Sequence, residues 1–279
     1  MKKLFTIFAV LLMAAGLVFT GCNKGKAQSS AEAHTIAVGG STSVTPLMEL
    51  FQAEYENAHD VKITISGTGS GDGIKGAGEG TYEIGMSSRE LTPAEIGTGL
   101  EPLVVAIDGI AVVLNTDNPI SGLTMDQIKE IYTGAISNWE QLGVAANGKT
   151  GGIAVVSREP GSGTRGAFQE LVKFSDGDLI RNAIIFDGTG AIKSAVASNV
   201  DAIGYISLGS VDSSIKAISV DGVAASNDNV KNGSYKIARP FILITKQGTA
   251  LNAATKAFLD WTLSDEGQTI VKKSWISVR

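Results

Sequence analysis

HTIAVGGSTSVTPLMELFQAEYENA, residues 34–58, joins a strand, a glycine turn and a helix in one stretch. The first five residues are typical of a short strand, which breaks at Gly39-Gly40. Apolar residues then recur at helical spacing over residues 47–58. Pro46 suits the first turn of this helix, and the hydroxyl residues before it suit its N-cap. The stretch therefore predicts a strand-to-helix turn that is rich in backbone N–H and hydroxyl donors.

The same order of strand, glycine turn and helix recurs further along the chain. Residues 61–65 alternate as a strand and run into the glycine-rich segment 67–73, after which we expect a short helix. Residues 152–156 form a second predicted strand, followed by the turn 157–165 and a helix over 166–173. This order, with 34 glycines and few aromatic residues, favours an α/β protein with a parallel sheet.

Two apolar runs are longer than an average strand and separate the chain into parts. Residues 103–115 are rich in valine and isoleucine and are interrupted by Asp108-Gly109; residues 235–245 form the second run. We expect each run to leave one domain and enter another, which makes two hinge strands with a cleft between the domains. The predicted domain I comprises residues 34–110 and 236–279, and the predicted domain II comprises residues 111–235.

The N-terminal segment is typical of export. Lys2 and Lys3 precede an apolar run that is too short for a comfortable membrane span, so residues 1–21 are predicted to be a signal peptide. The run ends at Phe19-Thr-Gly-Cys22, which resembles a lipobox, although Phe19 stands where leucine is usual. Residues 22–33 have the composition of a flexible tether. We expect lipidation of Cys22 and a cell-membrane location on the extracytoplasmic side.

Charge and composition exclude several classes of function. The formal net charge is −5, which argues against a nucleic-acid partner. The single cysteine leaves no internal disulfide and no cysteine metal cluster. The two histidines are His34, beside the tether, and His59, on a polar turn, and neither is a credible general base or metal ligand. We therefore expect no metal, no cofactor and no enzymatic activity.

Three turns combine glycine with hydroxyl residues before a helix: residues 40–43, 69–71 and 160–164. The first turn of a helix has unpaired N–H groups and a partial positive charge, so each turn can hold an oxyanion. Taken singly, each is also explained as a cap or a tight turn. Arg158 precedes the third turn and adds a guanidinium suited to bidentate phosphate binding. Three such turns around one cleft would surround a tetrahedral anion.

At this point the motifs resemble those of a known family. In order, they are GSTSVTP from Gly40, GTGS from Gly67, IGMSS from Ile84, VVSREPGSGT from Val155, AIGY from Ala202 and FILIT from Phe241. The pattern is similar to the phosphate-binding proteins of high-affinity phosphate ABC transporters. The resemblance implies a two-domain periplasmic-binding-protein fold of the class II type, with mixed sheets flanked by helices. It also implies a monomer whose partners are inorganic phosphate, the permease subunits and, through the lipid, the membrane.

The resemblance also implies which residues hold phosphate between the domains. They are Ser41, Thr42, Ser43, Ser70, Ser88, Arg158, Ser162, Gly163 and Thr164. Some family members carry an aspartate at the position of Ser88, and this carboxylate accepts the proton of hydrogen phosphate and repels sulfate. A serine hydroxyl can also accept a hydrogen bond, without the repulsion. Glu159 and Asp72 are candidates to replace the carboxylate, and the discrimination against sulfate stays open.

Other functions remain as alternatives. A binding protein for sulfate, molybdate or tungstate would use the same donors. An exported phosphate-hydrolysing enzyme would need a metal cluster or an activated nucleophile, and neither a G-x-S-x-G elbow around Ser162 nor a lysine after Gly163 is present. Residues 71–76 fit the G-x-G-x-x-G pattern of dinucleotide-binding enzymes, but no complete Rossmann unit adjoins them.

Overall fold

The computed structural model describes residues 34–143 and 151–279. All of the described residues belong to one compact unit. The predicted signal peptide, the tether and Cys22 lie outside the described residues. Within the described ranges, no helix combines the length and the apolar character that crossing a membrane requires.

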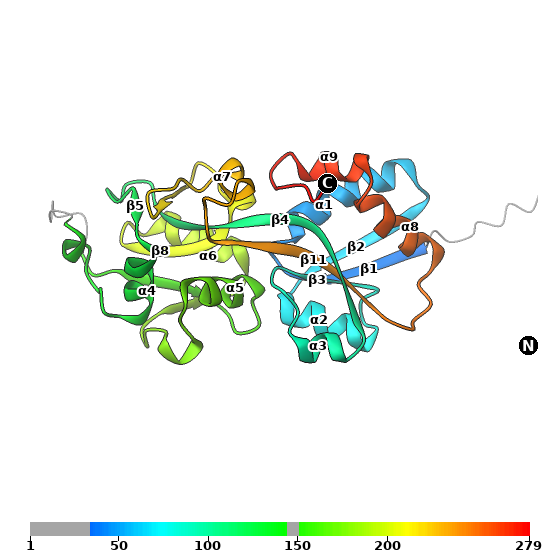
Figure 1. Ribbon diagram of the computed structural model, residues 1–279, viewed down its shortest axis with the longest axis horizontal. Coiled ribbons are helices and arrows are strands. Elements are labelled where there is room, and N and C mark those ends of the chain that lie inside the picture. Colours follow the sequence, from blue (N-terminus) through cyan, green and yellow to red (C-terminus); the bar gives the residue numbers. More distant parts are fainter. Residues whose placement is uncertain (1–33, 144–150) are drawn as a thin grey trace, which may run out of the picture. The chain divides into compact units, whose positions relative to one another are not determined.

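One nine-stranded mixed sheet runs through the protein in the order β2-β1-β3-β11-β4-β8-β6-β7, with β9 paired to β4 (Figure 1). Its strands are β1 (His34–Gly40), β2 (Val61–Gly67), β3 (Ile84–Ser87), β4 (Leu100–Asn115), β6 (Ala154–Arg158), β7 (Ile184–Phe186), β8 (Ala202–Ser207), β9 (Ile215–Ala217) and β11 (Ala238–Lys246). A separate pair joins β5 (Gly122–Leu123) and β10 (Ser219–Val220). The predicted α/β class with a mixed sheet is confirmed.

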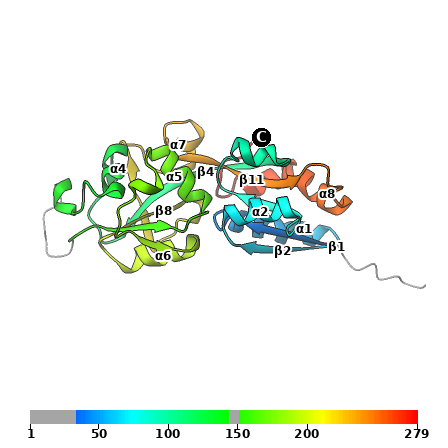
Figure 2. The same ribbon diagram turned by 90° about the horizontal axis from the view of Figure 1, so that it is seen from below.

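The part of the sheet formed by β2, β1, β3 and β11 carries helices on both faces, and we call this part with its helices the first lobe (Figures 1 and 2). On one face, a core around Phe51 and Phe258 joins α1, α8 and α9 to the sheet. On the other face, a smaller core around Ile74 and Ile244 joins α2 to the sheet. The helices of this lobe are α1 (Thr45–Ala58), α2 (Ser70–Glu79), α3 (Pro93–Gly97), α8 (Ala253–Thr262) and α9 (Asp265–Val271).

The part formed by β8, β6, β7 and β9 with the end of β4 is built in the same way, and we call it the second lobe. On one face, Tyr132 and Phe168 pack with Tyr205 of the sheet, and the Phe168 and Tyr205 rings stack 4.0 Å apart. On the other face, Ile192 and Val196 pack on the sheet. Its helices are α4 (Met125–Thr133), α5 (Gly163–Val172), α6 (Gly188–Ser198) and α7 (Asn227–Lys231), with short 3-10 turns at Trp139–Leu142, Asp176–Asp178 and Leu208–Ser210.

Strands β4 and β11 connect the two lobes. Residues 100–109 of β4 pair antiparallel with β11, and residues 110–114 pair antiparallel with β8 of the second lobe. The first of the two long apolar runs is thus a single strand that passes between the lobes, as predicted. In the second run the strand begins only at Ala238, and just before it the N–H of Ile110 in β4 donates to the Ile237 carbonyl at 2.8 Å. The domain boundaries themselves stay a prediction.

Several helices begin earlier than the sequence predicted. Helix α2 begins at Ser70, inside the glycine-rich segment, and α5 begins at Gly163 rather than Gly166. Glycine and serine are typical of turns, but the first helical turn tolerates them because its N–H groups need no partner within the helix. The hydroxyl-bearing turn residues therefore lie at helix N-termini.

Candidate anion-binding site

The turns predicted to hold an anion meet where the two lobes touch. Ser41, Thr42 and Ser43 follow β1 and lead into α1, and Ser88 follows β3. Ser70 begins α2, while Gly163 and Thr164 begin α5 of the second lobe. Helices α2 and α5 lie on either side of the junction in both views (Figures 1 and 2). The backbone joins them as well, because the N–H of Gly71 donates to the Gly161 carbonyl at 2.9 Å.

Buried hydroxyls from both lobes are hydrogen-bonded to one another. Ser43 Oγ lies 2.7 Å from Thr164 Oγ1 of the second lobe. Ser88 Oγ accepts from Ser41 Oγ at 2.8 Å and lies 3.3 Å from Ser70 Oγ. Each of these side chains is at most 2% exposed. Because each hydroxyl has one proton to donate and two lone pairs that accept, this cluster is a concentrated set of hydrogen-bond donors and acceptors.

Arg158 lies at the end of β6 and is 1% exposed. Its guanidinium forms an ion pair with Glu159, at 2.6 Å and 2.7 Å. It also donates to Thr42 Oγ1 of the first lobe at 3.1 Å. The Tyr205 hydroxyl accepts from the Arg158 backbone N–H at 3.2 Å, which anchors the end of the strand. The arginine therefore reaches across the junction of the lobes.

Ser162 and Gly163 hold the start of α5. Ser162 Oγ accepts from the N–H of Arg165 at 3.2 Å and so caps the helix. A helix cap was the structural alternative to anion binding for this turn. Gly163 lies against the first lobe so closely that a Cβ atom there would be 2.2 Å from Ser70 Oγ and 2.9 Å from Ser88 Oγ. Only glycine permits this approach of the backbone.

The sequence reasoning missed three residues of this site. Thr189, in the first turn of α6, lies 3.2 Å from Ser43 Oγ, and its N–H donates to Thr42 Oγ1. Its Gly-Thr-Gly context is the same signal that marked the other turns. Arg239 of β11 and Asp108 of β4 form a buried ion pair at 3.1 Å beside Thr164. The sequence marks both residues only as charged side chains inside long apolar runs, Asp108 in residues 103–115 and Arg239 in residues 235–245.

Burial dominates the electrostatics of this pair. It raises the pKa of Asp108 to about 6 and lowers the pKa of Arg239 to about 10. Hydrogen bonds from Arg239 and Ser207 to Asp108 oppose the shift of the carboxyl. Both shifts favour the neutral forms and have the same cause, because each group is enclosed by the two lobes.

The candidate carboxylates are placed differently from one another. The Glu159 carboxylate forms an ion pair with Arg158 and also accepts a hydrogen bond from the N–H of Gly188 at 3.2 Å. Asp72 is exposed and, with Glu159 and Asp187, lines a cavity of about 580 Å³ outside the hydroxyl cluster. Neither is hydrogen-bonded to Ser88, whose hydroxyl is hydrogen-bonded only to other hydroxyls among the described residues. The position where some relatives carry aspartate therefore offers a hydroxyl acceptor here.

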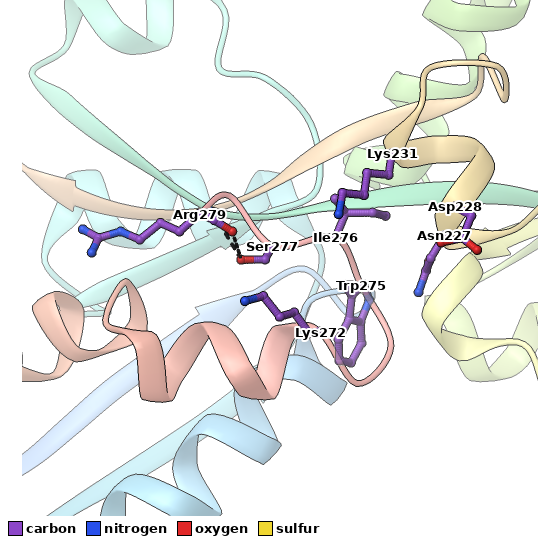
Figure 3. Close-up of a pocket in the computed structure, with 8 residues that line it drawn as sticks. All are labelled: Asn227, Asp228, Lys231, Lys272, Trp275, Ile276, Ser277 and Arg279. Carbon is purple, nitrogen blue, oxygen red and sulfur yellow. Dashed lines mark hydrogen bonds between the residues drawn. The ribbon is translucent and has the colours of Figure 1, made fainter.

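A different pocket, of about 210 Å³, lies between α7 and the C-terminal segment (Figure 3). Lys231 and Lys272 approach it from the two lobes, and Trp275 forms part of its wall. None of the predicted site residues lines this pocket. Over the described residues, no group of three or more histidine, cysteine, aspartate or glutamate side chains is arranged to hold a metal ion.

Comparison with known proteins identifies the family. The model of the PBP superfamily domain matches residues 25–266. The phosphate-binding protein PstS of Bacillus subtilis is 31% identical over 284 residues, which cover 96% of this chain and 91% of that protein.

Solved structures agree with this match. A Clostridium perfringens structure with bound phosphate, assigned as a phosphate ABC transporter substrate-binding protein, is 47% identical with a TM-score of 0.85. The comparison covers 88% of this chain and 100% of that one. An ABC-type phosphate transport receptor from Vibrio cholerae is 34% identical with a TM-score of 0.70, covering 86% and 99% of the two chains. The chain therefore belongs to the PBP superfamily and, within it, to the family of PstS phosphate-binding proteins.

Proposed function

We propose that this protein captures inorganic phosphate between its two lobes and delivers it to an ABC transporter. The observation that carries the proposal is the hydroxyl cluster shared by the lobes, with Arg158 donating across their junction. A tetrahedral anion needs many donors that converge from several directions, and helix N-termini with hydroxyls supply them. The names of the relatives point to the same ligand.

Nine residues are proposed to hold the anion. The hydroxyl protons of five of them, which are shared within the cluster, would turn toward the ligand oxygens when phosphate enters; these five are Ser41, Ser43, Ser70, Ser88 and Thr164. Arg158 would supply a positive charge to the ligand, and Glu159 balances this charge when no ligand is bound. The nine are Ser41, Thr42, Ser43, Ser70, Ser88, Arg158, Ser162, Gly163 and Thr164, and Thr189 is added to them on its contacts with Thr42 and Ser43.

Closure of the lobes is proposed to trap the ligand. The donors come from both lobes, so a ligand that bonds all of them stabilises the arrangement in which the lobes touch. Strands β4 and β11 would act as the hinge, because they are the sheet strands that pass between the lobes. The closed form would then dock on the permease subunits.

Selectivity for phosphate is proposed to rest on Ser88. Hydrogen phosphate carries a proton that needs an acceptor, and the Ser88 hydroxyl can accept it, while sulfate has no proton to donate. Since a hydroxyl does not repel sulfate as a carboxylate would, we expect phosphate to be preferred by a modest factor, about 10-fold, the value of one neutral hydrogen bond.

Titration calorimetry with phosphate, sulfate and molybdate tests this assignment. Saturable 1:1 binding of phosphate that tenfold excess sulfate only partly displaces supports it. Tighter binding of sulfate or molybdate than of phosphate would instead favour a binding protein for another tetrahedral oxyanion. Release of phosphate from an organic phosphate ester by the purified protein would reveal catalysis, which the proposal does not include.

Attachment to the membrane is proposed to occur through a lipid on Cys22. The support is the sequence pattern Phe19-Thr-Gly-Cys22 with the polar segment after it. Mass analysis of the N-terminal peptide from membranes checks this, with the Cys22→Ser variant as control. A diacylglycerol-modified N-terminal cysteine is expected, and an intact N-terminus at Met1 in the membrane fraction would contradict it.

A further inference from the structure

Building on the proposed function, we propose that Arg239 is a positioning residue of the anion site, which contacts both lobes and fixes the direction in which the Thr164 hydroxyl donates. Arg239 lies on β11 directly opposite Asp108 of β4, at the place where the two connecting strands run side by side. Its side chain is 2% exposed. Arg158 and Arg165 are the other buried arginines of the described residues.

Every guanidinium nitrogen of Arg239 donates at least one hydrogen bond. Nη1 donates to the Ser88 carbonyl at 2.7 Å and to Thr164 Oγ1 at 2.8 Å. Nη2 and Nε donate to Asp108 Oδ2 at 3.1 Å and 3.3 Å, and Ser207 Oγ donates to the other carboxylate oxygen at 2.9 Å. The Phe241 ring lies 5.2 Å below the guanidinium carbon. This arrangement holds the planar fork of the arginine in one orientation.

A guanidinium can only donate, so Thr164 Oγ1 must accept from Arg239. The single proton of the Thr164 hydroxyl is then directed elsewhere. Its nearest other neighbour is Ser43 Oγ at 2.7 Å, inside the cluster. A phosphate oxygen is a stronger acceptor than a serine hydroxyl. Arg239 therefore sets Thr164 as a donor toward the ligand when the lobes meet, which lowers the cost of orienting this hydroxyl in the closed form.

Arg239 also connects this donor to the hinge. Ser88 belongs to the first lobe and Thr164 to the second, and Arg239 bonds both from a strand that passes between them. A rotation that separates the lobes would break the contact with Thr164, while the pair with Asp108 would persist because both residues lie on the connecting strands. The orientation of Thr164 is therefore correct only when the lobes meet.

A double-mutant cycle tests this inference. Since Arg239→Met alone would leave Asp108 buried without a partner, the pair is removed as Asp108→Asn/Arg239→Met, with Asp108→Asn alone as a further arm. Phosphate affinity is measured by calorimetry for this variant, for Thr164→Val and for the combined triple variant, and thermal melting without phosphate confirms that each is folded. Lys236→Met, an exposed change near β11, is the control and should bind phosphate as the wild type does.

We expect removal of the pair to weaken phosphate binding about 10-fold in the wild-type background. In the Thr164→Val background, the same change should weaken it less than about 3-fold, because the hydroxyl that Arg239 orients is gone. Equal losses in both backgrounds would overturn the inference. Arg239→Lys keeps the positive charge but loses the planar guanidinium that bonds several groups at once. Full phosphate affinity in that variant would therefore overturn the inference as well. Absence of phosphate binding by the wild type would instead refute the proposed function.

Discussion

At the scale of single residues, the site is built by hydroxyls and glycines that the local sequence marks clearly. Gly163 shows why both kinds are needed. Its missing Cβ lets the start of α5 approach Ser70 and Ser88 of the first lobe. The hydroxyls can therefore share one cluster across the lobes.

Gly163→Ala is expected to weaken phosphate binding about 10- to 100-fold. The new Cβ would lie 2.2 Å from Ser70 Oγ and 2.8 Å from Ser70 Cβ, so the lobes cannot close fully. The free energy of unfolding without phosphate should be unchanged or higher, since alanine favours a helix more than glycine does. Gly190→Ala, at a helical glycine with no atom within 4 Å of the added Cβ, is the matched control. Calorimetry and chemical denaturation measure the two effects, and an unchanged affinity in Gly163→Ala would contradict the described contact.

The sequence predicted the residues whose role depends on their own neighbours in the chain. Ser41 to Ser43, Ser70 and Thr164 each follow a glycine or precede a helix, and the structure brings them together. The pairing of Arg239 with Asp108 could not be predicted, because it depends on the register of β11 against β4. Thr189 carried the same signal as the other turns, but its proximity to Ser43 follows only from the placement of α6.

At the scale of elements, the short helix α3 secures the segment that follows Ser88. Thr92 and Glu95 form a reciprocal capping box at its start. Glu95 also accepts two hydrogen bonds from Arg89, at 2.8 Å and 2.9 Å. The Arg89 stem in turn lies near Gly166 of α5 in the second lobe. Arg89 therefore connects the capping residue Glu95 to the place where the two lobes meet.

The cap gives a prediction about pH. Hydrogen bonds from Arg89 lower the pKa of Glu95 to about 2, so the folded state holds this carboxylate ionised more strongly than the unfolded chain does. Its contribution to the free energy of unfolding is present above about pH 4.5 and is lost as the pH falls toward 2. Because the side chains of the pair are about a quarter exposed, we expect about 1–2 kcal/mol after screening.

Chemical denaturation of the wild type and of Glu95→Gln at several pH values between 2 and 6 measures this contribution. The difference in unfolding free energy between the two proteins should be largest at pH 6 and should shrink toward pH 2. Glu90→Gln, a change at a neighbouring acidic residue that forms no ion pair in the described structure, is the control. A difference that stays constant across this range would contradict the role given to Arg89.

At the scale of the whole described unit, function depends on two lobes joined by two strands. The apolar runs predicted this connection, since a strand as long as β4 can pair with a strand of each lobe. The sequence could not set the angle between the lobes, because that angle is fixed by contacts such as Arg158 with Thr42 and Ser43 with Thr164, which join residues far apart in the chain.

Closure on phosphate should be visible in solution. X-ray scattering is expected to give a smaller radius of gyration with saturating phosphate than without it, because the ligand bonds donors of both lobes. The Gly163→Ala variant should show little or no decrease at the same phosphate concentration. Identical scattering of the wild type with and without phosphate would contradict a hinge-closing trap.

The central claim is that Arg158 and the hydroxyls of both lobes hold phosphate. Arg158→Met alone would leave Glu159 without its partner in a nearly buried position, so the most direct test uses Arg158→Met/Glu159→Gln, which removes both charges. Calorimetric titration with phosphate at physiological ionic strength is the measurement. We predict 1:1 binding by the wild type and a loss of about 100-fold in the double variant, the value of hydrogen bonds to a charged group. Equal phosphate affinity in the two proteins would contradict the claim.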